Sequence, residues 1–200
     1  MFSYCLNNPT NYCDPNGKSG HIAYEPWNCT CSACVTPRVA VVYDERTSGY
    51  LFGQFGGKGF EKQAQAQIER LTNYFHVETY GFSDMDEFVS KWNSLSGSFY
   101  SIYILSHGTP GAMACAGKDI GNSGCNYSFS DLNHVSACKV YLFCCNGATK
   151  NANNQSTADA FSKICGANVL AVSNGSLNYT RIKFEPYATE GGIWITVSAS

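Results

Sequence analysis

Two short segments of the 200-residue chain carry side chains that can do nucleophilic chemistry. The segment KVYLFCCNG (residues 139–147) is an apolar run that ends in two adjacent thiols, Cys144 and Cys145. Because side chains alternate between the faces of a strand, one thiol is expected to face the core and the other a surface or cleft. The segment YSIYILSHG (residues 100–108) ends another apolar run in His107 and Gly108. A thiol, a histidine and backbone N–H donors are the components of cysteine-based acyl transfer, which includes peptide-bond hydrolysis.

Apolar strands that alternate with amphipathic helices are expected to position these residues. The patterns predict strands over 38–45, 76–82, 98–108, 139–145 and 167–173, and helices over 60–75, 83–97 and 156–166. We expect Ser83 to cap the second helix, Ser156 or Thr157 to cap the third, and Gly166 to end it. The tail, residues 181–197, is expected to form a hairpin. Such an alternation predicts an α/β fold with a mostly parallel sheet and helices on both faces.

Ligands of such sheets bind beyond the carboxyl ends of the strands. If the runs that end at His107 and Cys145 are parallel neighbours about 4.8 Å apart, the two side chains can flank one scissile bond. Gly108 would let a substrate carbonyl approach the backbone closely, and its N–H and that of Cys145 are candidate oxyanion donors.

The two segments resemble the caspase-like cysteine peptidases, the group that includes caspases, legumains, clostripain, gingipains and CHAT domains. These proteins share an apolar strand closed by His-Gly and a later strand closed by the nucleophilic Cys, and the likeness covers roughly residues 38 to 175. It implies a caspase-like three-layer α/β sandwich and a cysteine endopeptidase with His107 as the catalytic histidine and Cys145 as the nucleophile. Gly108 would then be an oxyanion donor, and Cys144 would pack in the core. Phe143 stands where many members have Asp.

The same resemblance indicates where substrate side chains would bind. It places the pocket for the residue before the scissile bond on ANVLAVSNGSLNY (residues 167–179). This segment offers Ser173 and Asn174 as substrate-binding residues and carries no charge. Glu185 and Glu190 in the tail leave a preference for basic residues open.

Residues 1–17 resemble the end of an RHS-repeat core, in which Asn7-Asn8-Pro9 and Asp14-Pro15-Asn16-Gly17 occupy the motif positions. The alternative is that the second of these is only a turn. In RHS proteins a variable toxin domain begins just after the motif. The resemblance therefore implies an RHS core end at 1–17, a Cys-rich linker at 18–37 and the peptidase domain at 38–200. Because the RHS shell is absent, we do not expect Asp14 to act in this chain.

An RHS tip of this kind implies a bacterial toxin effector that is secreted or delivered into a target cell as part of a larger protein. Its expected partners are a protein or peptide substrate and a cognate immunity protein. The first residues, MFSYCLNNPT, lack the pattern of a secretory signal. A net charge of −2 gives no reason to expect a nucleic-acid partner, and no apolar run approaches the roughly 20 residues of a membrane span.

The chain contains 11 cysteines, an odd number, so at least one thiol stays unpaired. Cys29, Cys31 and Cys34, with Cys13 or His21, could supply four ligands to a tetrahedral structural zinc. Disulfides among these cysteines and Cys5 are the alternative. No catalytic metal or organic cofactor is expected.

Other cysteines and histidines have less specific interpretations. Cys115 and Cys125 bracket a glycine-rich loop that a disulfide could close, or that could act as a flexible lid. His76 and His134 are expected to be packing or surface residues. Two functions besides proteolysis remain open: a Cys-His enzyme that deamidates or crosslinks glutamine, and an inactive interaction module.

Overall fold

The computed structural model describes residues 12–13, 21–22, 37–46, 59–121, 124–179 and 186–199. The chain separates into two units, Met1–Val35 and Thr36–Ser200. In the first unit, β1 (Tyr12–Cys13) pairs antiparallel with β2 (His21–Ile22). The rest of the RHS-like motif, including Asp14, and the cysteines proposed as zinc ligands or disulfide partners at 29, 31 and 34 lie outside the described residues.

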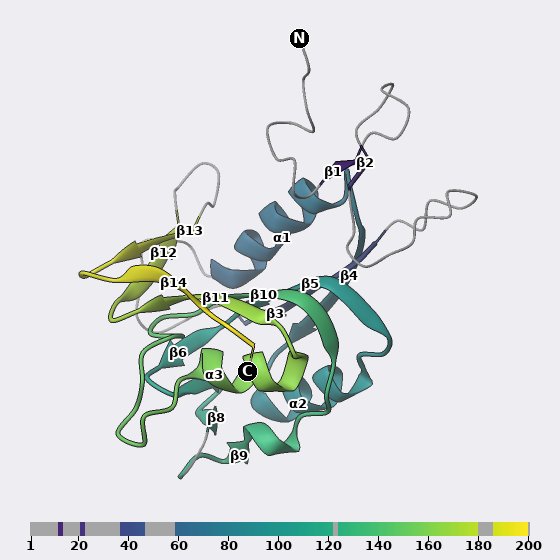
Figure 1. Cartoon of the computed structure of the whole chain (residues 1–200). Helices are drawn as coiled ribbons and strands as arrows, with labels where there is room; N and C mark the ends of the chain where they lie inside the picture. The colour runs from purple at the N-terminus through teal and green to yellow at the C-terminus, as the bar shows by residue number, and fades with distance from the viewer. Residues whose placement is uncertain are drawn as a thin grey trace. The chain divides into compact units, whose positions relative to one another are not determined.

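A six-stranded sheet forms the centre of the second unit, in the order β14-β11-β10-β5-β3-β4 (Figure 1). All neighbouring strands are parallel except β14, which runs antiparallel to β11. Because both faces of such a sheet are covered, its central strands are rich in apolar residues, whereas the edge strand β4 is more polar. The strands are β3 (Arg38–Asp44), β4 (His76–Phe82), β5 (Ser98–Leu105), β10 (Ser136–Phe143), β11 (Asn168–Ser173) and β14 (Ile193–Val197).

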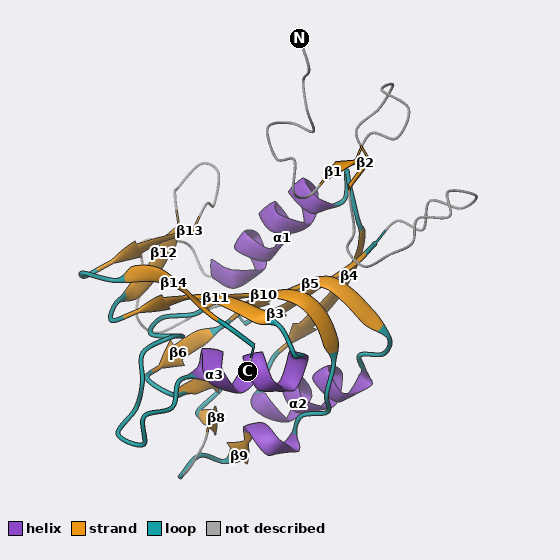
Figure 2. Ribbon diagram, in the orientation of Figure 1, coloured by secondary structure: helices purple, strands orange, loops and turns teal. Residues whose placement is uncertain are grey.

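Helices cover both faces of the sheet, which confirms the predicted three-layer α/β sandwich. Figure 2 shows α1 (Gly59–Leu71) on one face, and α2 (Met85–Ser94) and α3 (Thr157–Cys165) on the other. Among the described residues, no helix has both the length and the apolar content needed to cross a bilayer.

The helix ends follow the predicted capping chemistry with one correction. Ser156 caps α3 in a capping box with Asp159, and Gly166 ends the helix in the left-handed region, as expected. The cap of α2 is Asp84 rather than Ser83, because the Asp84 carboxylate accepts the Glu87 N–H at 2.8 Å. Ser83 instead donates its own N–H and hydroxyl to the Glu87 carboxylate.

Each face of the sheet carries its own apolar cluster. On the side of α2 and α3, Trp92 packs between Phe88 and Phe161, with ring centroids 6.1 and 5.1 Å away. Each of these rings is fully buried, which stabilises the fold by about 1.5–3 kcal/mol per side chain. The second cluster, on the side of α1, has Leu105 and Phe143 in its buried core. We call it the α1-side cluster.

The segment after His107 differs from the prediction. Strand β5 ends at Leu105, and His107 begins a four-stranded sheet instead of closing the long strand. The expected loop between Cys115 and Cys125 contains a strand of this sheet at residues 118–121, and no disulfide closes it, because both thiols are free. The strands are β6 (His107–Thr109), β7 (Ala112–Cys115), β8 (Lys118–Gly121) and β9 (Tyr127–Ser128). Strands of two to four residues are too short for alternation to reveal them.

The predicted C-terminal hairpin is also corrected. A turn does occur at Glu190 and Gly191, both with positive φ, but the strands on its two sides belong to different sheets. Strand β13 (Pro186–Thr189) pairs with β12 (Ser176–Tyr179), whereas β14 pairs with the sheet edge β11. The β12–β13 hairpin thereby contributes Leu177 to the α1-side cluster.

The strand order locates the place where a ligand is expected. The chain adds β4 on one side of β3 and then crosses to add β5 on the other side of β3. The order in which strands are added therefore changes direction between β3 and β5. Open α/β sheets bind ligands beyond the carboxyl ends of the strands at such a switch point. Those ends carry Asp44 on β3 and Ser106-His107 after β5.

Candidate functional site

His107 lies just beyond the carboxyl end of β5. Ser106 is buried and its N–H donates to the Phe143 carbonyl at 3.3 Å, which ties the end of β5 to the end of β10. The His107 side chain reaches solvent, and its ring meets the Phe60 ring of α1 edge-on, with centroids 4.9 Å apart. Partial desolvation lowers the pKa of His107; the Asp44 carboxylate opposes this shift, and Arg46 adds to it.

The two adjacent thiols occupy different environments, as the alternation of side chains predicts. Cys144 is 1 % exposed, and burial raises the pKa of its thiol, so it remains a neutral apolar group. The expectation that Cys144 packs in the core is confirmed. Cys145 is partly exposed and borders the α1-side cluster together with Phe60.

Gly108 brings the ends of the two strands into backbone contact. A Cβ on Gly108 would lie 2.5 Å from the Cys145 carbonyl oxygen and 2.9 Å from both the Cβ and Sγ of Cys144. No real Cβ makes such contacts, so only glycine fits between the His107 and Cys145 segments. Gly108 therefore stands directly beside the Cys145 backbone.

The register of β5 and β10 places His107 and Cys145 together. Leu105 of β5 pairs with Phe143 of β10. Because side chains alternate, His107 follows Leu105 and Cys145 follows Phe143 on the same face. The His107 ring contacts Phe60, and Phe60 and Cys145 both pack against the α1-side cluster, so both side chains are on the α1 side of the sheet. In the part of the chain that the structure describes, no hydrogen bond joins the imidazole to the thiol. This arrangement suits a histidine that acts on a group held between the two.

The Cys145 sulfur does have a hydrogen-bond donor. The Leu177 N–H, in β12, points at Sγ from 3.3 Å. Next to it, the Asn146 N–H donates to the Gly175 carbonyl at 2.9 Å. These two hydrogen bonds hold β12 and the preceding Gly175 against Cys145 and Asn146. No sequence pattern indicated this contact.

A threonine hydroxyl fixes the turn that follows Cys145. The Asn174 N–H donates to Thr149 Oγ1 at 2.6 Å, and the same hydroxyl donates to Asn146 Oδ1 at 3.1 Å. Both asparagines have positive φ, at 56° and 54°. The single Thr149 hydroxyl thus connects the turn after β10 to the turn after β11.

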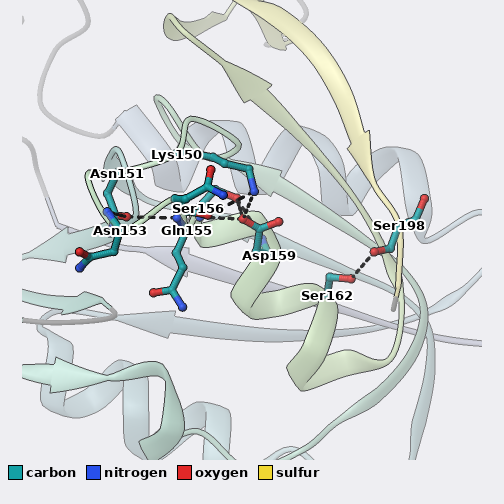
Figure 3. A network of polar contacts seen from close by, with 9 residues as sticks. Lys150, Asn151, Asn153, Gln155, Ser156, Asp159, Ser162 and Ser198 are labelled. Atoms are coloured by element: carbon teal, nitrogen blue, oxygen red, sulfur yellow. Dashed lines mark hydrogen bonds and ion pairs between the residues drawn. The ribbon is translucent and has the colours of Figure 1, made fainter.

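The loop beyond this turn is held by a second polar network, shown in Figure 3. Asn151 Oδ1 accepts the N–H groups of Asn153 and Gln155, which closes the loop on itself. Lys150 Nζ points to Asp159 in the first turn of α3, 3.3 Å away. The Lys150 ammonium is therefore paired with α3.

Ser173 and Asn174, the predicted substrate-binding residues, differ in accessibility. Ser173 ends β11 and is only 9 % exposed. Asn174 is exposed, and its backbone is tied to the Thr149 hydroxyl. The structure therefore places Asn174 close to the turn that follows Cys145, while most of Ser173 is covered.

An ion pair that the sequence analysis did not identify lies beside His107. Asp44 is 1 % exposed, and Arg46 donates its backbone N–H and Nε to Oδ1 at 3.0 Å each and a terminal nitrogen to Oδ2 at 2.7 Å. This contact raises the pKa of Arg46. Burial, reinforced by the Asp44 charge, raises the pKa of the neighbouring Cys115 thiol to about 12. The charge of the Asp44 carboxylate is therefore balanced by Arg46, and the Cys115 thiol is unreactive.

An acidic residue at the end of an otherwise apolar strand was the available signal for Asp44. No cluster of three or more histidine, cysteine, aspartate or glutamate side chains suited to a metal occurs among the described residues. The residues that the structure gathers are a thiol, an imidazole and backbone donors, a set that can carry out acyl transfer without a bound group. No model of a known protein family matches the chain, and no curated protein matches it.

The different environments of the cysteines predict selective alkylation. With brief iodoacetamide treatment of the folded protein, we expect modification at Cys145 and at the exposed Cys138, while Cys144 stays unmodified until the protein unfolds. Peptide mapping by mass spectrometry measures all three rates in one sample. Equal modification of Cys144 and Cys145 would contradict the burial that separates them.

The Thr149 hydroxyl predicts a matched pair of variants. Thr149→Val keeps the shape but removes both hydrogen bonds, so we expect it to lower the free energy of unfolding by about 1–3 kcal/mol. Thr149→Ser keeps the hydroxyl and should recover most of this loss. Urea denaturation measures both variants, and equal stability of the valine and serine proteins would contradict the bridging role.

Proposed function

We propose that the protein is a cysteine endopeptidase whose nucleophile is Cys145 and whose catalytic histidine is His107. The observation that carries the proposal is the contact of His107-Gly108 with Cys144-Cys145 at the carboxyl ends of adjacent parallel strands. The site lies beyond the carboxyl ends of two central strands, next to the topological switch point, where α/β folds bind ligands. The thiol is partly exposed and the imidazole is accessible to solvent, so a substrate can reach both.

The proposed reaction has two steps. The Cys145 thiol transfers its proton to His107 as Sγ attacks the scissile carbonyl carbon, and the C–N bond breaks as His107 passes that proton to the leaving amine. His107 then accepts a proton from the water that attacks the thioester. The C–S bond breaks, the acid product leaves, and His107 returns the proton to the sulfur. The Leu177 N–H, which donates to Sγ, contacts the sulfur from the β12 side.

Gly108 is the proposed oxyanion donor. It faces Met113 across the β6–β7 ladder, one residue from the pair Thr109–Ala112 that flanks the Pro110-Gly111 turn. Hydrogen-bonded and non-hydrogen-bonded pairs alternate along an antiparallel ladder. If the pair beside the turn exchanges hydrogen bonds, the Gly108 N–H points away from β7. The Cys145 N–H would be the second donor.

We further propose that this peptidase is a toxin effector at the tip of a larger RHS protein, delivered into a target cell and countered by an immunity protein. The support is the resemblance of residues 1–17 to the end of an RHS core. A peptidase domain after that motif would act on proteins of the target cell.

The proposal predicts that cleavage depends on both residues. In a cell lysate treated with wild-type protein, we expect new protein N-termini that disappear with Cys145→Ala and His107→Ala, a rate loss of at least about 10³-fold for each. Mass-spectrometric mapping of N-termini measures cleavage across the whole lysate. Cys138→Ala, at an exposed cysteine outside the site, is the control and should retain full activity.

The same samples distinguish the other functions. Crosslinked proteins, or the small mass gain of deamidated glutamine, without new N-termini would assign Cys145 and His107 to glutamine chemistry instead. Cleavage that continues unchanged in Cys145→Ala would show that another group or a contaminant is responsible. If the protein neither cleaves nor modifies other proteins, its function is that of an interaction module.

A further inference from the structure

We propose that Glu190 selects a cationic side chain, lysine or arginine, next to the bond that reacts at Cys145. The inference deepens the proposed function, because it names the substrate class of the same site. Glu190 belongs to the turn between β13 and β14, and its backbone has φ of 58°. The sequence left its position relative to Cys145 open.

Hydrogen bonds connect Glu190 to the thiol through two consecutive residues of β12. The Leu177 N–H donates to Cys145 Sγ, and the preceding residue, Ser176, donates its hydroxyl to Glu190 Oε2 at 2.5 Å. Thr189 supports this arrangement from β13, because its hydroxyl donates to the Ser176 carbonyl at 3.3 Å. The carboxylate is thus held on the segment that touches the nucleophile.

The orientation of β12 leaves this carboxylate open to solvent. Leu177 is buried in the α1-side cluster, whereas the neighbouring Ser176 is partly exposed and points to the opposite side of the strand. Glu190 itself is exposed. A ligand in solution can therefore reach the carboxylate without any movement of the core.

Within the part of the chain that the structure describes, Glu190 has no cationic partner. Among the described residues, its one bonding partner is the neutral Ser176 hydroxyl. The other nearby carboxylate, Asp44, is bound through both oxygens by Arg46. Lys150, which follows Cys145 in the chain, is directed at Asp159 (Figure 3). A cation brought by the substrate would supply the missing charge.

The distances suit a long basic side chain. Along the path through the Ser176 hydroxyl, the Ser176–Leu177 peptide and the Leu177 N–H, the Glu190 carboxylate lies within about 11 Å of Cys145 Sγ. A lysine or arginine side chain spans about 6–7 Å from Cα to its charged group, and an ion pair adds about 3–4 Å. Such a residue beside the reacting carbonyl is long enough to reach Glu190.

A pair of alkylating probes tests the inference without depending on catalysis. N-(4-aminobutyl)iodoacetamide carries a cation, and N-pentyliodoacetamide is its neutral counterpart of equal length. We expect the cationic probe to be favoured at Cys145 relative to the exposed Cys138 in the same molecule. Glu190→Gln should lower this preference by about two- to fivefold, and added salt should weaken it in the wild type. Glu69→Gln, at an exposed glutamate of α1, is the control and should not change it.

Peptide cleavage supplies the second measurement. Peptides that differ only in lysine, arginine, glutamine or leucine before the scissile bond are compared for wild type and Glu190→Gln. Loss of a basic preference in the variant supports the inference. If Cys145-dependent cleavage occurs but neither the probe preference nor the cleavage preference changes in Glu190→Gln, the role of Glu190 is overturned and the peptidase stands. A Glu190-dependent probe preference without any cleavage would overturn the peptidase and retain the cation-binding role.

Discussion

The structure of the candidate site depends on the parallel pairing of β5 with β10 and on the glycine that follows it. The pairing continues in register up to Leu105 and Phe143, and Gly108 then lies against the backbone of Cys144 and Cys145 with no space for a side chain. This contact holds a histidine-bearing segment and a thiol-bearing segment side by side. A larger residue at position 108 would push them apart, and a shift of register by one residue would exchange the two thiols between core and site.

The remaining features of the site follow from the ends of the neighbouring strands. To one side, the buried Asp44 and the partly exposed Arg46 form an ion pair that leaves little net charge beside His107. To the other side, the edge of β12 meets Cys145 through the Leu177 N–H. Parallel strands bring the polar residues at their carboxyl ends to one side of a sheet whose interior is apolar. The sheet thus positions the loops, and the loops carry the reactive side chains. Glu190, on the turn that leads into the edge strand β14, adds an exposed acidic charge next to Ser176 of β12.

Much of this arrangement could be predicted from local patterns. Long apolar runs and helical periodicity were sufficient for the parallel sheet and its helices, and alternation was sufficient to assign one thiol of the pair to the core. The β6–β9 sheet could not be predicted in this way, because strands of two to four residues have too few positions to show a period. The divergence of β13 and β14 could not be predicted either, since a turn sequence specifies the reversal of the chain but not the strand that each arm will pair with. Contacts such as Leu177 N–H to Cys145 Sγ, or Thr149 between two turns, join residues far apart in sequence and leave no local signal.

The central claim, that His107 and Cys145 form one site, can be tested most directly by an NMR titration of the imidazoles. In Cys138→Ser protein, Cys145 is converted either to its carboxymethyl derivative, which is negative, or to the carboxamidomethyl derivative, which has nearly the same shape and no charge. We predict that the pKa of His107 will be higher in the first protein than in the second, by on the order of one unit, because a nearby negative charge stabilises the imidazolium. The pKa values of His76 and His134 should be the same in both. Identical His107 titrations in the two proteins would contradict the account, because the imidazole would then lie too far from the thiol to share a substrate with it.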